Sequence, residues 1–133
     1  MHAASQTVSK PALWTGRVIS TIVILFMLMD AGMKVVKVPM VLQESAKVGM
    51  SETAVQTIGF VLLISTVLYA IPTTAILGAI LLTGYLGGAI ATNVAFHTGW
   101  FPIVFALIFG VLGWLGLFAR DRELRALIPV RVR

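Results

Sequence analysis

Two oppositely charged side chains, Asp30 and Lys34, stand near the end of a long apolar segment that runs from about Trp14 to Val36. Residues four positions apart lie on one face of a helix, so the carboxylate and the ammonium can pair. An ionisable group in a membrane segment is costly, and by default it marks a functional site. We therefore expect this pair to orient a ligand or carry a proton. The alternative is an anchor in which Lys34 reaches the headgroups and Asp30 holds it.

A second apolar segment, residues 75–96, carries two polar side chains, Tyr85 and Asn93. Neither side chain is satisfied in hydrocarbon, so both are expected to face the interior of a bundle. Asn93 falls toward the same end of the bundle as the charged pair, which predicts one shared polar pocket. Its expected members are Asp30, Lys34 and Asn93, joined by Glu52 or Gln56.

The composition is that of an integral membrane protein. Of the 133 residues, 59% are hydrophobic and only 11% are charged, whereas soluble domains are about a quarter charged. A spanning helix needs about 20 apolar residues, and the chain supplies four such stretches. We predict an all-α, antiparallel four-helix membrane bundle. The expected organisation is an N-terminal tail at 1–13, a transmembrane domain at 14–119 and a basic, membrane-surface tail at 120–133.

Helix-breaking residues separate the four stretches. A polar connection after Val36 predicts a short surface helix at 40–47, and Ser51 is a suitable N-cap for the second span. Pro72 predicts a tight turn before the third span. A further turn at 97–99 precedes the last span, which is expected to end near Ala119.

Glycines are concentrated in the third and fourth spans. Gly84 and Gly88 form a small-xxx-small pair, which favours close packing of helices in membranes. The fourth span carries Gly110, Gly113 and Gly116. We interpret these five glycines as helix-packing positions. A glycine face on the fourth span could also pack against a second subunit or a flat lipophilic ring.

The basic residues predict the orientation of the chain. With four spans, both termini lie on one side. That side carries Lys10, Arg17, Arg120, Arg122, Arg125, Arg131 and Arg133, and the other carries Lys34, Lys37 and Lys47. The positive-inside rule then places both termini in the cytoplasm, which for a bacterium means the inner membrane. We accordingly interpret the net charge of +5 as serving contacts with anionic lipid headgroups and not the binding of nucleic acid.

Several classes of chemistry find no support in the sequence. There is no cysteine, and the two histidines are isolated, so no metal site is predicted. His97, in the turn, is expected to be solvated. Nucleotide-binding and hydrolase signatures are missing as well. We predict no catalytic residue and expect that the chain is not a self-contained enzyme.

Four segments resemble a known family. They are DAGMK at 30–34, LYAIP at 68–72, TAILGAILLTGYLGGA at 74–89 and the ending from WLGL at 114–117 through LRALIP at 124–129. Together they are similar to the DoxX-like family of small bacterial membrane proteins over residues 14–129. The third segment is the most specific. Two positions depart from the family pattern: Thr73 stands where relatives commonly have Arg, and Asn93 where they commonly have His.

The resemblance implies a four-helix membrane bundle whose relatives include a subunit of a thiosulfate:quinone oxidoreductase. It suggests an accessory subunit that binds a quinone or another lipid, or that docks a membrane redox partner. The ligand-binding residues would be Asp30, Lys34, Tyr85 and Asn93. Asn93 can orient a ligand but cannot take up a proton at neutral pH. The alternatives are a dimeric proton-coupled small-molecule transporter and a structural assembly factor.

Overall fold

The structure is a computed structural model that describes residues 9–121 and residue 124. Throughout this part of the chain the elements are helical. They are α1 (Lys10–Val35), α2 (Pro39–Ala46), α3 (Glu52–Ala70), the short 3-10 helix η2 (Pro72–Thr74), α4 (Ala75–Ala95) and α5 (Trp100–Arg120). Four helical segments, α1, α3, η2 with α4, and α5, are long and apolar enough to cross a membrane. The prediction of an all-α membrane bundle with four spans is confirmed.

Helix boundaries follow local capping chemistry. The hydroxyl of Ser9 accepts a hydrogen bond from the amide of Ala12 at 3.3 Å, so α1 begins at Lys10, earlier than the expected start at Trp14. The predicted cap at Ser51 is confirmed, because its hydroxyl accepts from the amide of Ala54 at 3.2 Å. The predicted surface helix is also found, as α2.

The first and last spans extend beyond the range of 14–119 expected for the transmembrane domain. Residues 10–13, expected in the N-terminal tail, belong to α1. Arg120, expected in the C-terminal tail, is the last residue of α5. The remainder of the predicted surface tail at 120–133 lies outside the described residues, apart from Asp121 and Leu124.

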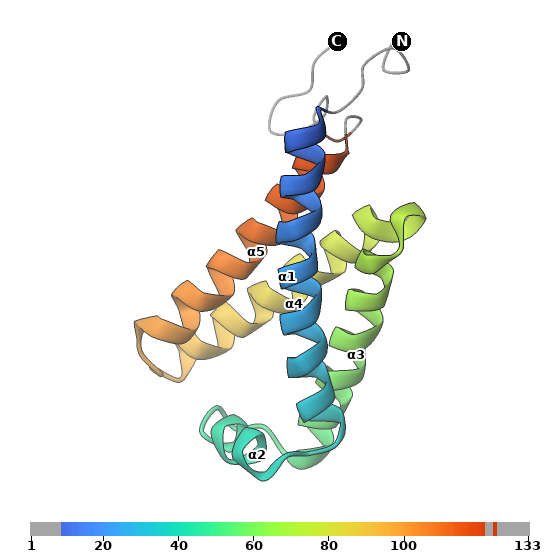
Figure 1. Ribbon diagram of the computed structural model, residues 1–133. Helices are drawn as coiled ribbons and strands as arrows, with labels where there is room; N and C mark the ends of the chain where they lie inside the picture. The colour runs from blue at the N-terminus through green and yellow to red at the C-terminus, as the bar shows by residue number, and fades with distance from the viewer. Residues whose placement is uncertain (1–8, 122–123, 125–133) are drawn as a thin grey trace.

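The spans pack differently at the two ends of the bundle. Where α1 begins, which we call the close end, α1 contacts both α3 and α5. At the other end α1 still contacts α3. In Figure 1 the start of α1 lies beside the end of α5, whereas the turn between α4 and α5 lies apart from α1 and α3. At the close end, a Cβ added to Gly16 would lie 2.7 Å from the backbone oxygen of Gly116. Only glycine permits such an approach.

A buried polar network holds this close end together. The Tyr69 hydroxyl donates to the backbone oxygen of Gly113 at 2.6 Å and lies 3.0 Å from the Ser20 hydroxyl. Arg120 Nε donates to the same serine at 3.2 Å. The network joins α1, α3 and α5. It satisfies polar groups that would otherwise be costly in hydrocarbon.

The glycines that let helices approach are mostly not the predicted ones. A Cβ on Gly116 would lie 2.5 Å from the Ser20 hydroxyl, so this prediction agrees with the geometry. A Cβ on Gly84, Gly88 or Gly113 meets nothing within 4 Å among the described residues, and one on Gly110 makes only an ordinary 3.7 Å contact. The helix-packing role of Gly84 and Gly88 therefore stays a prediction, since no partner for it lies within the described chain. The tight contacts instead involve Gly16, Gly59 and Gly78.

Candidate functional site

One face of α1 carries an aromatic ring followed by the two charges. Phe26, Asp30 and Lys34 are spaced four apart, so they point from the same side of the helix. Lys34 Nζ donates to Asp30 Oδ2 at 2.7 Å. The two side chains are only 16% and 28% exposed, respectively. The pair predicted from the sequence spacing is formed, and it is partly shielded from the surroundings.

Tyr85 of α4 completes a three-membered cluster. Its hydroxyl accepts a second hydrogen bond from Lys34 Nζ at 2.6 Å, and the ammonium lies 5.3 Å from the centroid of the tyrosine ring. The cluster therefore connects two helices that are remote in sequence. It offers the lysine a carboxylate oxygen and a phenolic oxygen as hydrogen-bond acceptors.

The base of Lys34 is held in place by α3. A Cβ on Gly59 would lie 2.7 Å from the Cβ of Lys34, so the two helices touch at this point. One turn earlier on α3, Gln56 Nε2 donates to the backbone oxygen of Val35 at 3.0 Å. That carbonyl is at the end of α1, where intrahelical partners run out. Both contacts fix the end of α1 and hence the direction of the lysine side chain.

Aromatic rings of α5 lie close to Phe26. The centroid of Phe26 is 4.5 Å from that of Phe109 in a stacked arrangement, and 5.2 Å from that of Phe105. Phe105 is in turn 5.8 Å from Phe101. Ring pairs at these separations attract one another beyond the effect of burial alone. They form an apolar, aromatic wall next to the charged cluster.

The charged cluster and the aromatic wall enclose one cavity, which we call the Lys34 cleft. Its volume is about 360 Å³, within the range common for small-molecule sites. The lining comes from three helices: Phe26, Met27, Met29, Asp30, Met33 and Lys34 of α1, Tyr85, Leu86 and Ala89 of α4, and Phe101, Pro102, Phe105, Ala106 and Phe109 of α5. The cleft is apolar apart from one polar end.

That polar end retains hydrogen-bonding capacity. An ammonium has three N–H donors, and within the described chain Lys34 uses two of them, on Asp30 and Tyr85. The third is available to an acceptor in the cleft. The carboxylate of Asp30 balances the positive charge of Lys34. When an uncharged ligand with a carbonyl oxygen binds, neither charge in the cleft is therefore left without its partner.

Asn93 and Glu52 do not join this cluster. Asn93 Nδ2 donates to the backbone oxygen of Ala89 at 2.7 Å, and its Oδ1 accepts from the Thr98 hydroxyl at 2.5 Å. Among described residues, neither Asn93 nor Glu52 lines the cleft. Gln56 reaches the backbone of α1 and not the charged side chains. The shared pocket predicted from helix depth therefore contains Tyr85 in place of Asn93.

Sequence reasoning overlooked the aromatic wall, although a signal for it exists. Phe101, Phe105 and Phe109 repeat every four residues, which places them on one face of α5.

The described residues contain no group of three or more His, Cys, Asp or Glu side chains that could hold a metal ion.

Comparison with known proteins gives one match. The model of the DoxX-like family matches residues 18–116, which include all four spans in whole or in large part. No curated protein and no solved structure matches the chain.

Proposed function

The chain belongs to the DoxX-like family of membrane proteins, and from this premise and the geometry of the cleft we propose that it binds a lipophilic molecule with a polar head, of the quinone class. One observation carries the proposal. A partly buried ammonium, held by Asp30 and Tyr85, stands at the end of a cavity that is otherwise apolar and aromatic.

Each part of the cleft matches a part of such a ligand. The free N–H of Lys34 would donate to a ring carbonyl, while the wall of Phe26, Phe105 and Phe109 would lie against the flat ring. The surrounding bilayer would supply the ligand laterally. Electrons carried by such a ligand would pass to a partner protein. In this proposal the protein is an accessory subunit of the membrane that presents a ligand to a redox partner.

The geometry gives less support to transport. A proton-coupled carrier needs an acid that is reached from both sides of the membrane. Asp30 is already paired with Lys34, and at the other end of α1 the backbones of Gly16 and Gly116 are in contact. A pH-dependent flux into proteoliposomes that Asp30→Asn abolishes would establish transport in place of ligand storage.

The test is native mass spectrometry of the detergent-purified protein, combined with organic extraction, on the wild type, Asp30→Asn and Lys34→Met. Lys47→Met is the matched control. Lys47 and Glu44 form a second ion pair at 2.9 Å, their side chains are 68% and 64% exposed, and neither lines the cleft. We expect a stoichiometric lipophilic ligand in the wild type and the control, and its loss in the two cleft variants.

Two results would contradict the proposal. If the ligand is retained equally in all four proteins, the Asp30–Lys34 pair does not bind it. If no ligand is found but the same protein partner copurifies with every variant, the chain is an assembly factor and the pair is an anchor at the membrane surface.

A further inference from the structure

A second hollow lies between α4 and α5, and we call it the Trp114 groove. Its volume is about 480 Å³. The lining residues are Thr83, Leu86, Gly87 and Ile90 of α4, Ala106, Leu107, Gly110, Val111, Trp114, Leu115 and Phe118 of α5, and Leu124. It shares only Leu86 and Ala106 with the lining of the Lys34 cleft. The groove is therefore a separate surface of the α4–α5 pair, and the proposed function makes no use of it.

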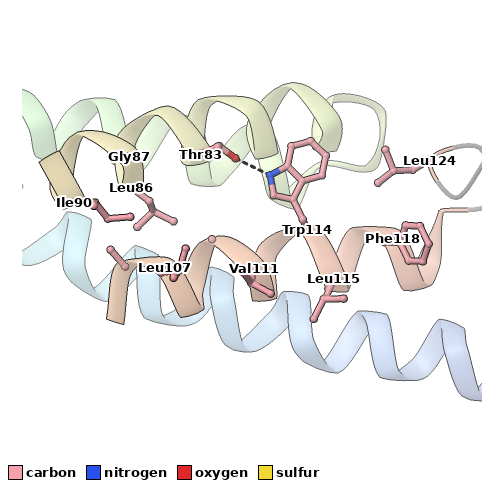
Figure 2. A pocket seen from close by; sticks show the side chains of 12 residues that line it. Thr83, Leu86, Gly87, Ile90, Leu107, Val111, Trp114, Leu115, Phe118 and Leu124 are labelled. Atoms are coloured by element: carbon pink, nitrogen blue, oxygen red, sulfur yellow. Dashed lines mark hydrogen bonds between the residues drawn. The ribbon is translucent and has the colours of Figure 1, made fainter. Parts of the chain in front are cut away.

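The polar groups of the groove wall are directed at each other. The Thr83 hydroxyl donates to the backbone oxygen of Ala79 at 2.7 Å and accepts from Trp114 Nε1 at 2.6 Å. Figure 2 shows this bond holding the indole across the gap between the two helices. Since each polar group has a partner, the wall presents hydrocarbon and recognises no polar head.

Leu124 lines the groove near the end of α5. Its backbone amide donates to Asp121 Oδ1 at 3.1 Å, and its side chain is only 3% exposed. In Figure 2 the leucine lies beyond the indole, near Phe118. The groove is thus bordered by α4, by α5 and by Leu124. Other exposed apolar side chains, such as Ile22 and Ile64, do not line it.

The length of the groove matches one leaflet of a bilayer. Leu107 and Phe118, near its two ends on α5, are eleven positions apart, or about 16 Å at the rise of an α-helix. Half of a bilayer's hydrocarbon core is about 15 Å thick. The end of the groove at Phe118 lies near the end of α5, on the side of the membrane that carries the chain termini.

We propose that the Trp114 groove holds a single hydrocarbon chain of a phospholipid from the leaflet on the side of the termini. Apolar lining, satisfied polar groups and a length of one leaflet are the properties that such a chain requires. The chain would lie along α5 from Leu107 to Phe118 and contact the indole of Trp114.

The test uses the fluorescence of Trp114 and its quenching by phospholipids brominated in their acyl chains. The sequence contains three tryptophans, so Trp14→Phe and Trp100→Phe leave Trp114 as the reporter. The protein is reconstituted in nanodiscs with increasing fractions of the brominated phospholipid. We expect a component of quenching that saturates at low fractions, above the gradual rise caused by bulk lipid.

Two glycines give matched variants. Gly87 lines the groove and Gly88 does not, yet both are exposed in α4 and a Cβ on either meets nothing within 4 Å in the described chain. Gly87→Leu should fill the groove and abolish the saturable component, while Gly88→Leu should retain it. Gly110→Leu fills the groove from α5 and should act like Gly87→Leu.

Two outcomes would overturn the proposal. Equal quenching in Gly87→Leu and Gly88→Leu would mean that Trp114 meets only bulk lipid. Absence of the saturable component, together with a cross-linked dimer that Gly87→Leu disrupts and Gly88→Leu preserves, would mean that a second copy of the chain fills the groove. Because neither outcome involves Asp30 or Lys34, the result is independent of the ligand test at the Lys34 cleft.

Discussion

The Tyr85 hydroxyl of α4 accepts a hydrogen bond from Lys34 of α1 over 2.6 Å. This bond connects the charged pair to a helix about fifty residues away in sequence, and so determines where the ammonium points. Tyr85→Phe removes the bond and keeps the ring. Affinity for decyl-ubiquinone, measured in nanodiscs, should fall about tenfold, equivalent to about 1.4 kcal/mol, because the ammonium loses the contact that directs it toward the ligand. Unchanged affinity would place the ligand elsewhere.

Substitution of the other tyrosine, Tyr69, is expected to affect stability and not ligand affinity. Tyr69 is fully buried, at 0% exposure, and its hydroxyl serves the Gly113 backbone and Ser20. Tyr69→Phe should lower the free energy of unfolding by about 1–3 kcal/mol, because buried polar groups lose a partner. Ligand affinity of the folded fraction should not change. The measurement is reversible unfolding in mixed detergent micelles. A larger loss of unfolding free energy in Tyr85→Phe than in Tyr69→Phe would contradict this assignment.

The glycines differ in the space around them. A Cβ on Gly78 would overlap the backbone nitrogen of Tyr69, whereas one on Gly84 meets nothing within 4 Å in the described chain. Gly78→Ala should therefore destabilise the bundle by about 1–3 kcal/mol through overpacking. Gly84→Ala should be neutral or stabilise it by up to about 1 kcal/mol through helix propensity. Thermal unfolding of both variants in detergent checks the contrast, and strong destabilisation by Gly84→Ala would point to an interface with a second chain.

The turn between α4 and α5 contains backbone strain that can be relieved. His97 has a φ of 53°, in the left-handed region, and Gly99 has a φ of 101°. His97→Gly should stabilise the protein by about 0.5–1 kcal/mol, while Gly99→Ala should destabilise it. Ligand binding should be unaffected by His97→Gly, since the imidazole does not line the cleft. Loss of binding in this variant would show that the histidine has a functional role.

Local features of this protein could be predicted from the sequence because they depend on neighbours along the chain. Ser51 caps α3 through an amide three residues away, and Pro72 turns the chain between two spans. The ion pair of Asp30 and Lys34 needs only one turn of helix. The number of spans depends only on the lengths of the apolar stretches, since those lengths must match the thickness of a bilayer.

The tertiary structure decided which faces of the helices meet. Within a bilayer both the lipid and the protein interior are apolar, so no polar stripe marks the outward side of a helix. For this reason the sequence could not show that Tyr85 would reach Lys34 while Asn93 bonds within its own turn. It could not separate the buried Gly78 from the open Gly84 either, because a glycine's role depends on the helix opposite. Sequence alone determined the number of spans, the cap at Ser51 and one ion pair. The packing of the helices placed that pair at the end of a cleft.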